Sequence, residues 1–252
     1  MELTGQLTPQ LKSLRLSGIL ETLEVRNKQA VDEQCSYVEF LQKLLEDEVE
    51  RRGQKQLSLR LRRSQLDPGK TLETFDFSFN NSVNRRNIYD LATCGFVHKA
   101  ESIFLLGPAG VGKTHLAQAF GHEAIRRGFD VTFIKASVML SHLHAGRADG
   151  SYERRLAALQ NVDVLILDDF GLKPMRPPAP EDLYEVIDGR YGKRPLVLTS
   201  NRAFDEWPEL FDNPVLASAA LDRLAHGANQ LVITGDSFRA KGQKKSSKES
   251  SD

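Results

Sequence analysis

The sequence predicts an α/β fold in which one parallel five-stranded sheet is covered by helices on both faces. Short apolar runs occur at residues 102–106, 131–134, 162–167, 196–199 and 231–234, and segments of helical pattern separate them. Such alternation is typical of parallel sheets, whose strands are buried on both faces. The length of 252 residues leaves room for this domain and a smaller appendage.

The appendage is expected at residues 1–66, as a small α-helical domain. Thr8 is followed by a proline, which is typical of an N-cap and a first helical residue, so a first helix is expected to begin there. Ser36 and Glu39 have the spacing of a capping box. They predict a second helix that ends near Arg52.

A basic connector is expected from Arg51 to Lys70, where Asp67 is the only carboxylate among many cations. Two interpretations stay open: a solvated helix face, or a contact with the phosphate backbone of a nucleic acid. The main domain is expected at residues 67–240. Residues 241–252 are rich in Lys and Ser and lack apolar side chains, which predicts a disordered tail.

Composition indicates a cytoplasmic protein without a membrane partner. Lys and Arg number 34 and so do Asp and Glu, so any affinity for a polyanion must come from local clusters. Cys35, Cys94 and the six histidines lack metal-ligand spacing. No apolar run approaches the ~20 residues of a membrane span, and the N-terminus lacks the layout of a secretory signal.

A phosphate-binding loop is predicted at residues 107–114 (GPAGVGKT), which match G-x-x-x-x-G-K-[ST] between a predicted strand and a predicted helix. Its glycines let backbone N–H groups converge on phosphates, Lys113 brings a charge to the β- and γ-oxygens, and the Thr114 hydroxyl suits Mg²⁺. The loop therefore predicts ATP and Mg²⁺ as cofactors. The expected nucleotide-binding residues are Gly107, Pro108, Ala109, Gly110, Val111, Gly112, Lys113, Thr114 and His115.

Two carboxylates end the apolar run at residues 164–167 and complete the predicted metal site. Because ligands of open α/β sheets bind at the carboxyl ends of the strands, Asp168 is expected to hold Mg²⁺ together with Thr114. Asp169 is expected to orient the attacking water or to accept its proton. The alternative, for the pair taken without the loop upstream, is a helix cap.

A third polar strand end is predicted at residues 199–201 (TSN). In a parallel sheet it lies level with the phosphate loop, so Asn201 is a candidate to hold the lytic water or to sense the γ-phosphate. The alternative is that Asn201 caps the following helix.

Together, the paired aspartates, the TSN strand end, residues 221–224 (LDRL) and residues 237–239 (SFR) resemble the AAA+ ATPases of the helicase-loader clade. Residues 145–150 (AGRADG), 201–207 (NRAFDEW) and 215–226 (VLASAALDRLAH) resemble the IstB family, the ATPase helper subunits of two-gene insertion-sequence transposons, which are similar to the helicase loader DnaC. The resemblance covers about residues 72–239. It implies a P-loop NTPase (AAA+) fold without a C-terminal lid.

The resemblance also implies an arginine finger, delivered to the γ-phosphate of a neighbouring subunit, and Arg223 occupies the matching place. The alternative is a surface ion pair of Arg223 with Asp222 or Asp188. Asp169 stands where the family commonly carries Glu, which implies slow hydrolysis. Arg239 is the candidate for a second sensing arginine.

The function implied is an ATP-dependent transposition helper that oligomerises on double-stranded DNA and recruits or stimulates a transposase. Its ATPase activity is expected to depend on Mg²⁺ and to rise with DNA and assembly. The alternatives are a DnaC-like replicative helicase loader and, for the loop alone, a metabolic kinase. Residues that the resemblance places near DNA are Arg147, Arg154, Arg155, Lys173 and Arg176.

Overall fold

The computed structural model describes residues 2–80 and 82–238. The chain divides into two compact units, Met1–Leu59 and Arg60–Asp252. Both the expected tail at residues 241–252 and Arg239 lie outside the described residues. Within the part of the chain that is described, no helix combines the length and the apolar character needed to cross a bilayer.

The N-terminal unit begins with two helices, α1 (Glu2–Ser13) and α2 (Ser17–Asp32), where the sequence predicted a single helix starting after Thr8. That prediction was wrong, because α1 starts upstream and Pro9 lies inside it. The chain reverses at Arg15, whose φ of 56° is left-handed. Such a residue is a common way to end a helix, and it splits the leucine-rich run in two.

The third helix, α3 (Tyr37–Ser64), starts at the predicted capping box. Ser36 donates its backbone N–H to Glu39 Oε2 at 2.7 Å, and Glu39 donates its own N–H to Ser36 Oγ at 3.3 Å. The helix does not end near Arg52, so most of the expected connector is helical. Residues 54–63 consist largely of Gln, Lys, Leu and Arg, which are strong helix formers, and this explains the extension.

Two cations of the expected connector are engaged within the N-terminal unit. Arg51 pairs with Glu21 at 2.8 Å, and Arg52 pairs with Glu48 at 2.6 Å. Glu48 is buried and accepts the N–H of Gly18, in the first turn of α2, at 2.6 Å. Burial alone would raise the pKa of Glu48, but the hydrogen bonds from Gly18 and Arg52 outweigh it and keep that pKa below its ordinary value.

The division between the units falls at Leu59, several residues before the expected boundary at 66. Arg60, on the last turns of α3, pairs with Asp130 at 3.1 Å. Asp67 donates its N–H to Gln118 Oε1 at 2.7 Å. These contacts assign residues 60–66 to the larger unit.

The larger unit contains the predicted parallel sheet of five strands. The strands are β1 (Ile103–Leu106), β2 (Val131–Lys135), β3 (Val164–Phe170), β4 (Leu196–Ser200) and β5 (Asn229–Val232). Their order is β2-β3-β4-β1-β5, and every pairing is parallel. All residues of β1 and β4 are buried, as continuous apolar runs in a two-sided sheet require.

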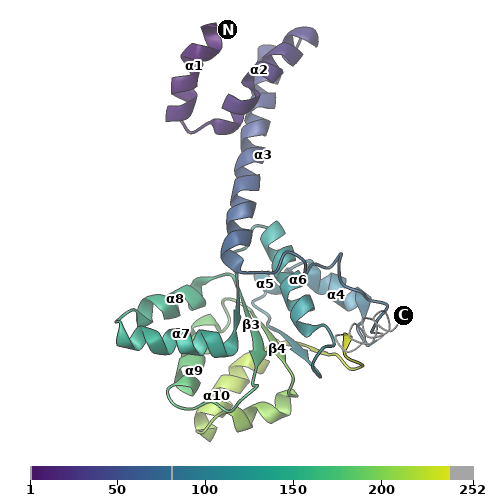
Figure 1. Ribbon diagram of the computed structural model, residues 1–252, viewed down its shortest axis with the longest axis vertical. Coiled ribbons are helices and arrows are strands. Elements are labelled where there is room, and N and C mark those ends of the chain that lie inside the picture. Colours follow the sequence, from purple (N-terminus) through teal and green to yellow (C-terminus); the bar gives the residue numbers. More distant parts are fainter. Residues whose placement is uncertain (1, 81, 239–252) are drawn as a thin grey trace, which may run out of the picture. The chain divides into compact units, whose positions relative to one another are not determined.

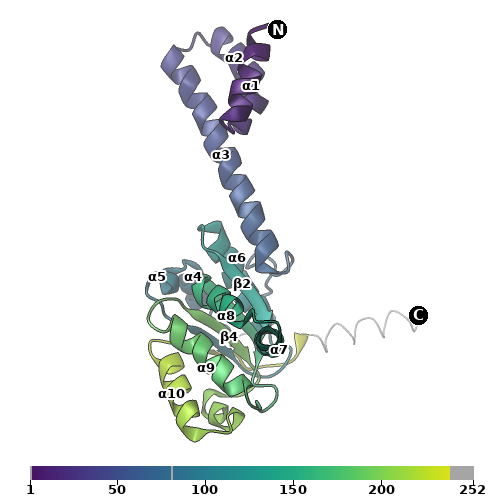
Figure 2. The same cartoon turned by 90° about the vertical axis from the view of Figure 1, so that its left-hand side faces the viewer.

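Helices cover both faces of this sheet, as predicted (Figures 1 and 2). One group is α4 (Arg85–Ala92), α5 (Gly95–His98) and α6 (Lys113–Arg126); the other is α7 (Ala136–Ala148), α8 (Tyr152–Asn161), α9 (Ala179–Arg190) and α10 (Pro214–Ala225), with the 3₁₀ helix η1 (Phe204–Leu210). Phe104 and Leu165 belong to the core formed with the second group. Ile166, the neighbour of Leu165, reaches Gly121 of α6 on the opposite face.

A buried arginine holds together the amino-terminal ends of the strands. Arg190, at the end of α9, is 1% exposed and donates to the carbonyl oxygens of Leu159 at 2.6 Å, Val162 at 2.8 Å and Pro195 at 2.7 Å. Burial, and then the charge of Arg194, lowers the pKa of Arg190 to about 9. The side chain therefore stays charged at neutral pH, and these carbonyl groups supply its solvation.

Replacing this guanidinium by an ammonium should destabilise the protein. In Arg190→Lys a single donor group faces carbonyl oxygens from three segments, so we expect a loss of at least about 3 kcal/mol in the free energy of unfolding. The measurement is urea denaturation followed by circular dichroism. The matched control is Arg194→Lys, because among the described residues Arg194 makes one long hydrogen bond, 3.5 Å to Gln160 O. Equal losses in the two variants would contradict this role of Arg190.

Candidate functional site

The predicted phosphate loop joins β1 to α6, and the backbone conformation of the loop requires its glycines. Gly107 has a φ of 142°, and a Cβ there would lie 1.9 Å from Ile233 O. Gly110 and Gly112 have φ values of 86° and 101°, which side chains rarely allow. The loop can therefore turn its backbone N–H groups toward one point.

Lys113 places its ammonium group at the end of β4. The residue is 7% exposed, and Nζ donates to Gly107 O at 2.7 Å, Pro108 O at 2.7 Å and Asn201 Oδ1 at 2.8 Å. Asn201 thus lies beside the phosphate loop, the place that a γ-phosphate sensor needs. The next helix, η1, has Ala203 as its N-cap.

Asp168, near the end of β3, connects β3 and β4 to the start of α6. It is 3% exposed, and its Oδ1 accepts hydrogen bonds from Thr114 Oγ1 at 2.8 Å and Thr199 Oγ1 at 2.6 Å. The contact exists because β4, which carries Thr199, lies between β1 and β3. The sequence predicted the strand end that contains Thr199, but it did not predict the hydrogen bond from Thr199 to Asp168. Only the order of the strands reveals that contact.

Asp169 lies where β3 is irregular, and its surroundings differ from those of Asp168. The pairing of β3 with β4 shifts register between Leu167 and Phe170, and Asp169 has a left-handed φ of 57°. Its N–H donates to Thr199 Oγ1 at 3.0 Å. Its carboxylate lies 3.2 Å from Lys135 Nζ, at the end of β2. Sequence reasoning missed Lys135, whose only signal is its place at the end of a strand.

A cavity of about 450 Å³ opens beside these residues, within the usual size range of ligand pockets. One part of its wall is polar and comprises the phosphate loop, Thr114, Asp169 and Asn201. Another part is aromatic and comprises Phe75, Phe79 and Phe238. Phe79 and Phe238 meet edge to face, with ring centroids 5.0 Å apart. The cavity thus offers both polar and apolar contacts to one ligand.

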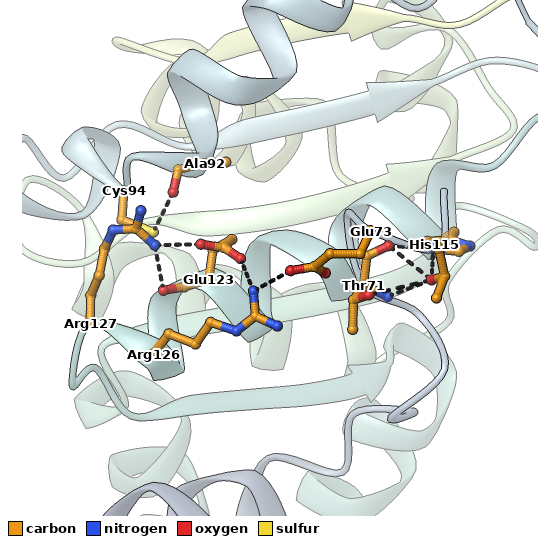
Figure 3. A network of polar contacts seen from close by, with 9 residues as sticks. Thr71, Glu73, Ala92, Cys94, His115, Glu123, Arg126 and Arg127 are labelled. Atoms are coloured by element: carbon orange, nitrogen blue, oxygen red, sulfur yellow. Dashed lines mark hydrogen bonds and ion pairs between the residues drawn. The ribbon is translucent and has the colours of Figure 1, made fainter. Parts of the chain in front are cut away.

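The segment that carries Phe75 is anchored to α6 by a polar network (Figure 3). His115 Nε2 lies 2.8 Å from Thr71 O, so the imidazole of this predicted nucleotide-binding residue contacts the segment. Arg126 pairs with Glu73 at 2.7 Å and with Glu123 at 2.6 Å. The hydrogen bond from Arg126 is the largest influence that lowers the pKa of Glu73 to about 2, so the pair persists well below neutral pH.

The oxygen donors at this site fit Mg²⁺ bound together with phosphate. Thr114 and Asp168 supply a hydroxyl and a carboxylate, the hard ligands that Mg²⁺ prefers. Over residues 2–80 and 82–238, no group of three or more His, Cys, Asp or Glu side chains could hold a metal. A cation here therefore needs phosphate or water oxygens as additional ligands.

Arg223, the predicted arginine finger, does not line the cavity of its own phosphate loop. On α10, its Nε lies 2.8 Å from Asp188 Oδ1, and its guanidinium lies over the ring of Tyr184 at 5.2 Å. One of the two alternative ion pairs considered from the sequence is thus present. The Arg223 side chain keeps 29% of its surface exposed, so another molecule can reach it.

Two of the predicted DNA-binding arginines are engaged within the chain. Arg147 pairs with the buried carboxylate of Asp182, and its guanidinium lies 4.1 Å from the ring centroid of Tyr152. Arg155 pairs with Asp149 at 2.6 Å. Both arginines stabilise the junction of α7 and α8.

The other three predicted DNA contacts are exposed and form no ion pair among the described residues. They are Arg154, Lys173 and Arg176. Arg154 lies on α8, and the other two lie between β3 and α9. Their charges are therefore available to a polyanion.

Comparison with known proteins identifies the family. A family model described as IstB-like ATP binding protein matches residues 9–246. An insertion-sequence protein of Mycobacterium tuberculosis, named for ATP binding, is 44% identical over 91% of this chain and 92% of its own length. The IS21 protein of Pseudomonas aeruginosa, named likewise, is 37% identical over 93% of this chain and 89% of its own.

The chain belongs to the IstB-like ATP-binding protein family. Solved structures agree with the fold: DnaI and the DnaC helicase loader match with TM-scores of 0.57 and 0.54, at 22% and 23% identity. These matches cover 65% and 66% of this chain, and 90% and 97% of those chains. A DnaA bound to AMPPCP and single-stranded DNA has a TM-score of 0.58 at 24% identity, over 68% of this chain and 52% of that one. At such identities the likeness shows the AAA+ fold alone.

Loosening the anchored segment should weaken nucleotide binding by this family member. In Arg126→Gln the ion pair with Glu73 is lost, so Phe75 is held less firmly at the cavity. An exposed ion pair contributes about 0.2–1 kcal/mol, so we expect the Kd of a fluorescent ATP analogue to rise by up to about fivefold. The matched control is Arg127→Gln, because Arg127 pairs with Glu123 and not with Glu73. An unchanged Kd in both variants would contradict the proposed role of the anchor.

Proposed function

We propose that this protein binds ATP with Mg²⁺ and hydrolyses it as an oligomeric AAA+ ATPase that acts on DNA during transposition. The observation that carries the proposal is the meeting of Thr114 Oγ1 with Asp168 Oδ1 at 2.8 Å, beside the ammonium group of Lys113. A hydroxyl, a carboxylate and an ammonium brought together at a glycine loop suit a metal-bound triphosphate. Family membership supports the same ligand.

The two parts of the cavity wall suggest the orientation of the nucleotide. The phosphates would lie along the loop, where residues 109–115 line the cavity and Lys113 brings its charge. The base would lie against the aromatic part, where Phe75, Phe79 and Phe238 offer ring surfaces. Bound Mg²⁺ would neutralise charge that develops on the phosphates, with Thr114 and Asp168 holding it.

Hydrolysis would depend on two further side chains. Asp169 lines the cavity and is positioned to accept a proton from the attacking water once its carboxylate turns away from Lys135. Asn201 would orient that water or the γ-phosphate, since it already contacts Lys113. Asp169 is one methylene shorter than Glu, so we expect slow turnover.

Assembly would complete the site through Arg223. Because this guanidinium lies outside its own nucleotide cavity and remains partly exposed, it can serve the nucleotide of a neighbouring copy. A charge delivered in this way stabilises the transition state for phosphoryl transfer. An isolated subunit should therefore be a poor ATPase.

A mixing experiment tests both halves of this site. Lys113→Ala should lack nucleotide binding, and Arg223→Ala should bind nucleotide but turn it over about 10³- to 10⁵-fold more slowly. At equal amounts, about a quarter of randomly formed head-to-tail interfaces would pair an intact loop with an intact arginine, so activity should return. The measurement is phosphate release at increasing protein concentration. No recovery at any ratio would rule out a finger in trans.

DNA and a transposase are the proposed macromolecular partners, in the cytoplasm. Relatives named for insertion sequences support a role in transposition, and the free cysteines, Cys35 and Cys94, fit a reducing compartment. Arg154, Lys173 and Arg176 are the favoured contacts to double-stranded DNA, because they are exposed and unpaired within the described chain. Contacts to phosphate give affinity without reading base sequence.

The salt dependence of DNA binding tests these contacts. Replacing Arg154, Lys173 and Arg176 together by Gln should reduce the slope of log Kobs against log salt by about 2 to 3, because each phosphate contact contributes about 0.9. The measurement is fluorescence anisotropy with double-stranded DNA in the presence of an ATP analogue. Lys193→Gln, which removes an exposed charge elsewhere, should keep the original slope. An unchanged slope in the triple variant would reject these residues as contacts.

A further inference from the structure

A second cavity lies at the opposite edge of the sheet from the phosphate loop. Its volume is about 270 Å³, and its wall includes Ser102 and Leu196, at the amino-terminal ends of β1 and β4. The charged and titratable side chains that line it are Lys99, Glu101, Arg190, Tyr191, Arg194, Arg223 and His226. Cations thus outnumber carboxylates in a concave site.

Two arginines of this cavity, Arg190 and Arg194, lie close together and have unused donor capacity. Arg190 NH1 and Arg194 NH1 lie 3.4 Å and 3.5 Å from the same carbonyl oxygen, that of Gln160, so two positive charges are close together. Arg190 Nε is buried and has no hydrogen-bond partner in the part of the chain that the structure describes. No ion pair joins either arginine to a carboxylate within residues 2–80 and 82–238. An anion in the cavity would relieve this repulsion.

The carboxylates near the cavity are partly occupied by other contacts. Glu101 Oε2 accepts a long hydrogen bond from Asn229 Nδ2 at 3.4 Å. Asp188 is paired with Arg223 and is half exposed. Lys99 is exposed and forms no ion pair among the described residues. An incoming anion would therefore compete with Asp188 for Arg223, while Lys99 and Arg194 are available.

We infer that this cavity is a polyphosphate site in which Arg194 and Lys99 act together with Arg223 on the phosphate chain of a nucleotide. The inference rests on the proposed in-trans role of Arg223, and it adds Arg194 and Lys99 as residues that bind the same phosphates. Arg194 contributes a planar group of donors that matches phosphate oxygens, and Lys99 a mobile charge. The nucleotide of a neighbouring copy is the proposed source of the phosphates; a free polyphosphate has the same chemistry.

Direct binding tests the site itself. Full-length Lys113→Ala protein, whose own loop is disabled, is titrated with inorganic tripolyphosphate by isothermal calorimetry. Adding Arg194→Gln should weaken binding about tenfold, since a hydrogen bond to a charged group contributes about 1.5–3 kcal/mol. Lys193→Gln removes a neighbouring exposed charge outside the cavity wall and should change little. Asp188→Asn should strengthen binding, because the competing carboxylate charge is lost.

Two results would overturn the site. One is the absence of tripolyphosphate binding at low salt. The other is an equal loss in Arg194→Gln and Lys193→Gln, which would indicate a diffuse charge effect rather than a built cavity.

Mixed assemblies identify the source of the phosphates. Arg223→Ala subunits, which keep an intact loop, are mixed with Lys113→Ala subunits that either carry or lack Arg194→Gln. Both phosphate release and the affinity for a fluorescent, non-hydrolysable ATP analogue should fall about tenfold when Arg194 is replaced. If the Lys113→Ala and Arg223→Ala mixture is itself inactive, the proposed function fails, and calorimetry still decides the site. If the mixture is active and insensitive to Arg194, the neighbouring nucleotide is rejected as the source.

Discussion

The proposed nucleotide site depends on one buried oxygen, Asp168 Oδ1, which accepts hydroxyl hydrogen bonds from Thr114 and Thr199. A carboxylate that is 3% exposed needs such partners, because burying an unpaired charge is costly. The two hydroxyl groups come from the start of α6 and from β4, so one atom ties the helix behind the phosphate loop to two strands. These hydrogen bonds also fix the positions of Lys113 and Asn201. Lys113 directly precedes Thr114 in the sequence, and Asn201 follows Thr199 by two residues.

The irregular end of β3 gives its two carboxylates different surroundings. The register shift beside Phe170 and the left-handed backbone of Asp169 turn that side chain toward Lys135, while Asp168 faces Thr114. Irregularities of this kind commonly re-aim side chains at functional sites. The buried carboxylate of Asp168, beside the loop, is suited to bind a metal ion. The half-buried carboxylate of Asp169, which lines the cavity, is suited to proton transfer.

The strands of a parallel sheet all end at the same edge, and this chain has a cavity at each of the two edges. The phosphate loop and its acidic partners lie at the carboxyl edge, whereas Arg223 and its basic cavity lie at the amino edge. Two different surfaces on one chain, one with the phosphate loop and the other with Arg223, suit the proposed head-to-tail association between copies, the geometry that rings and filaments share.

The sequence by itself determined the strands, the phosphate loop and the capping box at Ser36, because each depends on the types and spacing of residues that are close together in the sequence. It did not locate the start of α1 or the end of α3, since helix ends depend on backbone turns such as the one at Arg15 and on packing partners. The roles of Thr199 and Lys135 were likewise decided by tertiary structure alone. The order and register of the strands place Thr199 and Lys135 beside Asp168 and Asp169. Strand order and register arise from contacts between segments that are distant in the sequence.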